Sequence, residues 1–205
     1  MRQTVMPYIT DAPQLQGPPQ GQWTAADWEL LPEDGNVYEI INGALYMTGS
    51  PSYFHQWINQ NLVGYIGFPA NQQGLAFAVT APVGVFMPGC DPVQPDFVVV
   101  KKERAAIIHD RRIYGIPDLI VEILSPSNRA YDETTKMNAY AAAGLPEFGV
   151  VDPMSKQLRI FELEVPGQFR EARVFHEADT AHFNCLPTIE FKVGDLFAGA
   201  PDSTL

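Results

Sequence analysis

Two short apolar runs, each placed directly after a proline-aspartate pair, constrain the fold of this chain most strongly. They belong to the segments QPDFVVV at residues 94–100 and PDLIVEIL at residues 117–124. Segments of this length that are rich in Val and Ile and bounded by Pro or Gly are typical of buried strands. A carboxylate on a buried strand is costly unless another group compensates its charge. We therefore expect a buried sheet in which acidic side chains have partners.

Further strand-like segments surround these two runs. The dipeptide Asn42-Gly43 suits the positive φ angles of a type I′ turn, so it predicts a hairpin over residues 37–47. A second hairpin is predicted over residues 147–163. We expect additional strands over residues 75–79, 83–87, 172–176 and 189–197.

Helix signals alternate with these strands. Thr24, with an acidic residue three positions later, is typical of a helix start. A longer helix is expected to begin at Ser50 or Ser52 and to end at Pro69, and a third to end at Gly144. Strands mixed with a few helices predict an α/β or α+β domain in which helices flank a mixed central sheet. The expected helices span residues 24–31, 50–68 and 130–143.

The composition narrows the class of protein. The chain has 205 residues and a formal net charge of -11, which opposes tight nonspecific binding to a polyanion. Cys90 and Cys185 lie far apart and indicate neither a disulfide framework nor a CxxC metal site. The first residues lack the apolar core of a signal peptide, and no stretch reaches the roughly 18 apolar residues that cross a bilayer. We expect a cytoplasmic protein without membrane partners.

The ends of the chain differ in composition from its middle. Residues 11–22 are rich in Pro, Gly and Gln, which predicts a flexible N-terminal arm over residues 1–22. We expect one domain over residues 23–198 and a short C-terminal tail over residues 199–205.

The acidic residues on the two apolar runs are the first candidates for chemistry. Glu122 lies mid-strand among apolar neighbours, and Asp96 stands at the head of the other run. Each has a plain alternative: a salt-bridged glutamate, and an aspartate that closes a turn after Pro95. Two carboxylates that meet on adjacent strands repel each other and are readily held ionised by Mg²⁺. On the following helix, the four-residue spacing of Asp132, Lys136 and Tyr140 puts them on one face and predicts that the ammonium of Lys136 projects back toward the C-terminal end of the strand that carries Glu122.

The motifs YEIINGALY, QPDFVVV, the block from GIPDLIVEIL to EFGVVDP, and IEFKVGDLF resemble, in order, the Uma-type putative restriction endonucleases (domain of unknown function 820). That family lies within the PD-(D/E)xK nuclease superfamily, and the likeness covers about residues 24–198. The resemblance implies a restriction-endonuclease-like fold and a divalent-metal-dependent endonuclease that acts on DNA. It also implies that Asp96 is the motif aspartate, Glu122 its acidic partner and Glu39 an accessory glutamate.

One position departs from the superfamily pattern. Leu124 stands two residues after Glu122, where the usual lysine belongs, so Lys136 on the next helix would take that role. Asp118 also follows a proline. We favour Asp96 because Asp118 lies on the same strand as Glu122, roughly 13 Å away at ~3.3 Å per residue.

The mechanism implied by the resemblance is phosphodiester hydrolysis. Asp96, Glu122 and the backbone carbonyl of Ile123 would hold Mg²⁺ or Mn²⁺, while Lys136 and Glu39 would assist the attacking water. We expect a homodimer, with the exposed edges of the C-terminal hairpin as a candidate interface. Two alternatives remain: a catalytically inactive module that binds nucleic acid or protein, and a metal-free hydrolase that uses two carboxyl groups.

Three other features have both a functional and a structural interpretation. His55 could face a substrate or be an ordinary structural histidine. Arg129 could clamp a phosphate or pair with Asp132 or Glu133. The segment 101–112 is the most basic stretch and could face DNA or be a solvated loop.

Overall fold

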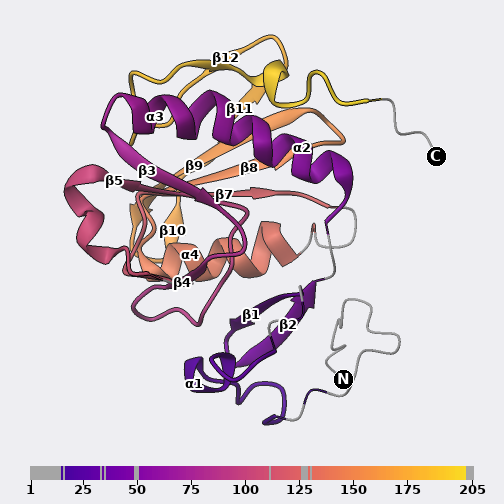
Figure 1. Ribbon diagram of the computed structural model, residues 1–205, viewed down its shortest axis with the longest axis vertical. Coiled ribbons are helices and arrows are strands. Elements are labelled where there is room, and N and C mark those ends of the chain that lie inside the picture. Colours follow the sequence, from indigo (N-terminus) through magenta and orange to yellow (C-terminus); the bar gives the residue numbers. More distant parts are fainter. Residues whose placement is uncertain are drawn as a thin grey trace.

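A seven-stranded mixed sheet forms the centre of the molecule (Figure 1). The computed structural model describes residues 15–201 except 16, 33, 35, 49, 50, 111, 126–128 and 130. The strands lie in the order β10-β9-β8-β7-β5-β3, and β11 also pairs with β9. Only the β7–β8 pair is parallel, so the predicted mixed central sheet is confirmed. The strands are β3 (Ala76–Thr80), β5 (Phe97–Lys101), β7 (Leu119–Ile123), β8 (Glu147–Asp152), β9 (Gln157–Val165), β10 (Gln168–Phe169) and β11 (Arg173–His176).

The two apolar runs are neighbours in this sheet. β5 and β7 pair antiparallel, with Phe97 opposite Val121, and every residue of β7 is buried. Because strand side chains alternate between faces, Val121 joins one hydrophobic core while Ile120 joins the other. The apolar run of β7 does not alternate with polar residues because the strand is covered on both faces of the sheet.

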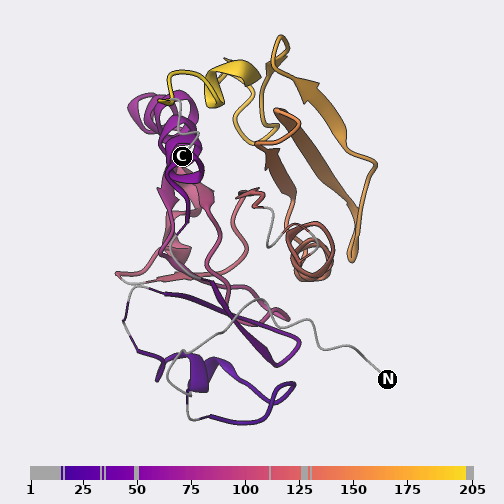
Figure 2. The same ribbon diagram turned by 90° about the vertical axis from the view of Figure 1, so that its right-hand side faces the viewer.

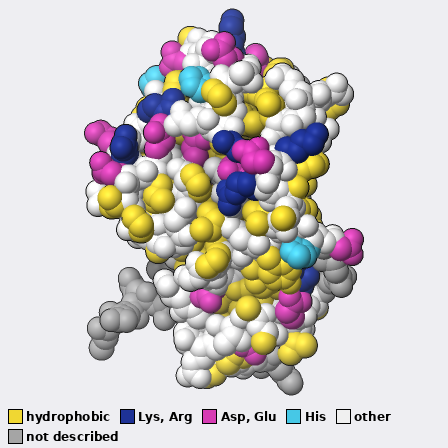
Figure 3. Space-filling view, turned by 90° about the vertical axis from the view of Figure 1, so that its left-hand side faces the viewer, with side chains coloured by type: hydrophobic (Ala, Val, Ile, Leu, Met, Phe, Trp, Pro, Cys, Tyr) yellow, Lys and Arg dark blue, Asp and Glu magenta, His cyan; other side chains and the backbone are white. Residues whose placement is uncertain are grey.

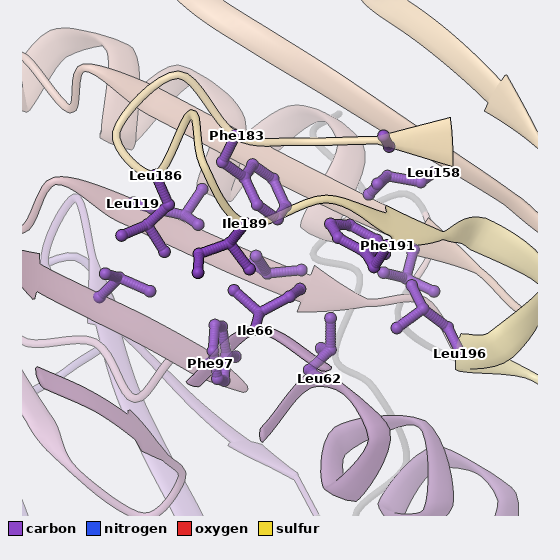
Figure 4. Packing of buried hydrophobic residues seen from close by; sticks show 14 of the residues in the cluster. Leu62, Ile66, Phe97, Leu119, Leu158, Phe183, Leu186, Ile189, Phe191 and Leu196 are labelled. Atoms are coloured by element: carbon purple, nitrogen blue, oxygen red, sulfur yellow. The ribbon is translucent and has the colours of Figure 1, made fainter. Parts of the chain in front are cut away.

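One face of the sheet is covered by a long helical segment and by the C-terminal part of the chain. Leu62 and Ile66 of the helical segment pack with Phe97 of the sheet and with Phe183 (Figure 4). Ser52 caps the segment by accepting a hydrogen bond from the amide of His55, as predicted. The segment comprises α2 (Tyr53–Leu62), the π-helical turn η1 (Val63–Gly67) and α3 (Phe68–Gln72).

The expected end of this helix at Pro69 is wrong, because the helical chain continues to Gln72. A proline inside a helix lacks the N–H donor and clashes with the preceding turn. Here the wide π-helical turn comes directly before it, and the amide of Phe68 bonds to the carbonyl of Val63, five residues back. The wider turn accommodates Pro69 in the first turn of α3, where no intrahelical donor is needed.

The other face of the sheet is covered by the helix that follows β7. Tyr140 of this helix packs against Phe148 in the second hydrophobic core. Gly144 ends the helix with a left-handed φ of 85°, as predicted from its position. The segment comprises a π-helical part, η3 (Tyr131–Lys136), and α4 (Met137–Ala143).

A separate two-stranded hairpin lies beneath the central sheet (Figure 2). Asn42 and Gly43 at its tip have φ angles of 52° and 69°, which confirms the predicted turn. Of the expected N-terminal arm, residues 1–14 and 16 lie outside the described residues, while the amide of Gly21 donates to the Gly43 carbonyl. The predicted capping box of Thr24 is present, although its helix is short. The elements are α1 (Ala25–Trp28), β1 (Val37–Ile41) and β2 (Ala44–Thr48).

The remaining elements are short and lie outside the central sheet. The expected strand over 83–87 pairs parallel with residues 112–114, and only two residues of the expected strand over 189–197 are extended. Both edges of the second hairpin, β8 and β9, are paired with other strands, so the edge we expected to be exposed there is covered. None of the described helices is long and apolar enough to cross a membrane. The elements are β4 (Gly84–Phe86), η2 (Lys102–Ile107), β6 (Arg112–Tyr114), β12 (Thr180–Ala181), β13 (Phe191–Lys192) and η4 (Val193–Leu196).

Candidate active site

A buried ammonium stands among three carboxylates beside the centre of the sheet. Lys136 Nζ lies 3.0 Å from Glu39 Oε2, 3.2 Å from Glu122 Oε1 and 3.4 Å from Asp132 Oδ1. The side chain of Lys136 is 7% exposed, and that of Glu122 is 2% exposed. The prediction that Lys136 projects toward the strand that carries Glu122 is confirmed. We call Lys136 and its three acidic partners the lysine cluster.

Glu122 reaches the cluster from the middle of the central sheet. Its strand β7 is buried on both faces, so the carboxylate depends on hydrogen bonds from the helix above it. Tyr140 Oη donates to Glu122 Oε1 over 2.6 Å, and Lys136 lies one helical turn earlier. The four-residue spacing of Asp132, Lys136 and Tyr140 thus presents all three to the same region.

Glu39 reaches the cluster from the separate hairpin. The amide of Gln94 donates to Glu39 Oε1 over 2.9 Å, and the amide of Ile40 donates to the Pro92 carbonyl. The hydroxyl of Tyr131 also donates to Glu39 Oε2 over 3.5 Å. The loop before β5 therefore fixes the hairpin in the position that brings Glu39 to Lys136.

Asp96 lies near the lysine cluster and contacts the backbone of β7. Its Oδ2 accepts a hydrogen bond of 2.8 Å from the amide of Ile123, the residue after Glu122. The imidazole Nε2 of His55 lies 3.2 Å from the same oxygen. The structure thus brings Asp96 to the strand of Glu122 and Ile123, as expected of a shared site.

The other Pro-Asp pair has a different environment. Asp118 accepts from the amide of Lys101 and forms an ion pair of 2.8 Å with Arg104. Arg104 also donates to the carbonyl of Ile116, the residue before the proline. These contacts hold Asp118 in a structural bridge, which supports Asp96 as the motif residue.

Burial and mutual repulsion raise the pKa values of Glu122 and Asp132. Burial raises the pKa of Glu122 well above its ordinary value, and Lys136 offsets this only in part while neighbouring carboxylates add to it. The pKa of Asp132 is raised to about 6, mainly by burial. Burial opposes the charged form of Lys136 as well, but the three carboxylates raise its pKa well above the ordinary value. One ammonium is therefore too little to keep all three acids ionised, and Glu122 and Asp132 hold their protons to higher pH than free carboxyl groups do.

Asp96 shows the opposite shift. Burial raises the pKa of its carboxyl group, but the hydrogen bond and charge of His55 and the charge of Lys136 outweigh burial and lower it. Burial also lowers the pKa of His55, and the interaction with Asp96 together with the backbone of Ile123 raises it above its ordinary value. Asp96 is thus held as a carboxylate.

The predicted metal ligands provide hard oxygen donors. Within the described part of the chain, no three His, Cys, Asp or Glu side chains lie close enough to hold one ion together. The predicted set therefore consists of two carboxylates, Asp96 and Glu122, with the carbonyl of Ile123 and water. Mg²⁺ is commonly bound by one or two carboxylates while it keeps several waters. The donor types present are therefore those that a divalent ion takes.

Three of the basic residues considered as DNA contacts have acidic partners. Arg129 lies 2.7 Å from Asp152 and 3.4 Å from Glu133, so the expected ion pair with Glu133 is present. In the segment 101–112, Arg104 pairs with Asp118 and Arg112 pairs with Glu29. The face in Figure 3 shows Lys and Arg interspersed with Asp and Glu rather than gathered together.

Sequence reasoning missed some of the contacts that build the site. Tyr131 and Gln94 both bond to Glu39, and neither was a candidate. Tyr140 was placed on the face of Lys136, but its bond to Glu122 was not foreseen. Tyr140 lies four residues after Lys136, so helical spacing could have indicated that it faces the site. Gln94 donates from its backbone amide, which the identity of its side chain cannot predict.

Comparisons with known proteins find a matching family model and a solved structure of similar fold. A family model described as Uma2, putative restriction endonuclease, matches residues 25–194. A solved structure from Anabaena variabilis, a putative nuclease belonging to domain of unknown function 820, is similar in fold with a TM-score of 0.72 and 21% identity. The alignment covers 85% of this chain and 97% of that chain. No curated protein matches the chain.

Proposed function

The chain belongs to the Uma2 family of putative restriction endonucleases, and on that premise we propose that it is a divalent-metal-dependent endonuclease that hydrolyses phosphodiester bonds of DNA. The observation that carries the proposal is that Lys136 contacts both Glu39 and Glu122. Asp96 lies nearby and accepts a hydrogen bond from the β7 backbone one residue after Glu122. Acidic groups from separate segments with one amine beside them are what metal-assisted phosphoryl chemistry requires. The similar fold of a solved putative nuclease supports the same reaction class.

The residues would divide the work as follows. Asp96, Glu122 and the carbonyl of Ile123 would hold Mg²⁺ or Mn²⁺, which when bound polarises the phosphate and lowers the pKa of bound water. Lys136 stays protonated because its pKa is raised, so it acts as a donor to developing negative charge and not as a base. Glu39 orients that ammonium through the 3.0 Å contact.

A second candidate is a catalytically inactive module that keeps the nuclease fold. The net charge of -11 and the pairing of Arg104, Arg112 and Arg129 with acids favour it, because DNA binding needs unpaired positive charge. A metal-free acid hydrolase would use the raised pKa of Glu122. A cavity of about 250 Å³ among the described residues is lined by residues such as Cys90 and Asp91 and not by the cluster, so this cavity does not supply the cleft that such a hydrolase needs.

Titration of Mn²⁺ by calorimetry, run beside a plasmid-nicking assay, separates these candidates. The wild type is expected to bind Mn²⁺ and to nick supercoiled DNA only with metal, and Glu122→Gln is expected to lose both. Metal binding without nicking would favour the inactive module. Hydrolysis that persists in EDTA would contradict metal dependence. The homodimer and the cytoplasmic location stay predictions.

A further inference from the structure

The carboxylate of Asp96 is held asymmetrically. Among the described residues, two groups act on Oδ2: the amide of Ile123 donates to it over 2.8 Å, and His55 Nε2 lies 3.2 Å from it as an ion-pair partner. Oδ1 receives no hydrogen bond from that part of the chain. An oxygen with two N–H partners has little capacity left for a cation, whereas the opposite oxygen keeps its lone pairs.

His55 is itself fixed in place. It lies in the first turn of α2, where its amide donates to the capping hydroxyl of Ser52, and its side chain is 13% exposed. Its Nδ1 is buried and has no partner among the described residues, so the ring interacts through Nε2, with Asp96 and with the backbone of Ile123. Because Nε2 faces a carboxylate, it must carry a proton and donate.

We propose that His55 is a positioning residue of the metal site, which by donating from Nε2 to Oδ2 turns Oδ1 of Asp96 toward the ion. The inference rests on the proposed metal-dependent function and adds a residue to it. Hydrogen bonds from neighbouring groups commonly orient the carboxylates that bind metals, and their loss weakens metal affinity.

The same contact allows an opposite interpretation, in which the His55 ring competes with the ion for Asp96. The two differ in sign: removing a positioning residue weakens metal binding, and removing a competitor strengthens it. A purely structural histidine would change thermal stability and leave metal affinity unaltered.

The test is the dissociation constant of Mn²⁺, measured by calorimetry at one pH for four proteins. We expect His55→Ala to weaken binding about 10–100-fold relative to the wild type. His55→Gln should recover most of that loss, because its amide N–H can reach the same carboxylate oxygen. His109→Ala, an exposed histidine whose ring contacts Tyr114, is the matched control and should bind as the wild type does.

Circular dichroism and the melting temperature without metal show whether each variant is folded. If folded His55→Ala binds Mn²⁺ with unchanged or higher affinity, the inference is overturned while the proposed function stands. Failure of the glutamine variant to recover affinity beyond the alanine variant would also overturn it. If the wild type binds no Mn²⁺, both the inference and the proposed function fail.

Discussion

Glu122 and Asp152 are buried carboxylates near the ends of the neighbouring parallel strands β7 and β8. Their surroundings nevertheless shift the pKa values of the two side chains in opposite directions. Asp152 closes the turn after β8 and has its own set of donors: Arg129, the amide of Met154 and the hydroxyl of Ser155. Burial raises its pKa, but these donors outweigh burial and lower it to about 2. Glu122 instead shares a single ammonium with two other acids, and its pKa is raised.

The difference shows that donors, and not burial alone, decide whether a buried acid stabilises the fold. A carboxylate with local N–H and guanidinium partners contributes stability in its charged form. Carboxylates that share too few donors carry a free-energy cost that a bound cation could remove. The carboxylate of Asp152 therefore stabilises the fold, whereas the lysine cluster would be stabilised by a bound cation.

Removing the ammonium of Lys136 should have the largest effect on the unfolding free energy. Lys136→Met leaves buried carboxylates without a counter-charge, so we expect a loss of about 3–5 kcal/mol in unfolding free energy at pH 8. The loss should be smaller at pH 5, where the acids can protonate. DNA nicking should fall by at least about 10²-fold, since a donor to transition-state charge is lost.

Urea unfolding at both pH values measures the stability effect. Lys156→Met is the matched control, because Lys156 is half-exposed and paired with Glu177 at the surface. Its unfolding free energy should change by no more than about 0.5 kcal/mol. A Lys136→Met protein as stable as this control would contradict the account of the cluster.

Neutralising Asp132 should stabilise the folded protein, in contrast to the loss expected at Asp152. Its pKa in the folded protein is about 6, above the ordinary value of 3.8, so the folded state binds more protons and stability falls as pH rises between those values. The difference is worth up to about 3 kcal/mol above pH 6. Asp132→Asn lacks this cost, and its melting temperature should exceed that of the wild type at pH 8 and match it near pH 4. A gain that is equal at both pH values would rule out titration as its cause.

Neutralising Asp152 should have a smaller and opposite effect. Its folded pKa of about 2 lies below the ordinary 3.8, so its contribution is complete above about pH 4 and is lost as pH falls toward 2. We expect Asp152→Asn to lower the unfolding free energy by about 2 kcal/mol at pH 7. The deficit measured by denaturant titration should shrink toward pH 3. If Asp132→Asn and Asp152→Asn shift stability in the same direction at pH 8, the two environments are not of opposite kind.

Local features of the backbone, such as helix caps and turns, could be predicted from the sequence. The capping box at Thr24, the turn at Asn42-Gly43 and the helix end at Gly144 all lie where they were predicted. Each of these residues determines the conformation of its own neighbours, so no distant contact is needed. The long apolar runs likewise identified β5 and β7 as buried strands.

Features that depend on distant partners were harder to predict. The helix passes Pro69 because a π-helical turn precedes it, and residue preferences give no warning of such a turn. Arg129 reaches Asp152, which only the packing of the helix against β8 determines. For the site, spacing on one helix placed Lys136 correctly, whereas the role we infer for His55 depends on which oxygen of Asp96 it meets.

The lysine cluster spans two structural units of unequal strength. Glu39 comes from a hairpin of two strands, and the other members come from the central sheet and its helix. Two-stranded ribbons are marginally stable alone, and small units open more readily than a whole domain. Release of the hairpin would therefore separate Glu39 from Lys136 while the large sheet stays intact, so the lysine cluster is expected to come apart under milder denaturing conditions than the central sheet.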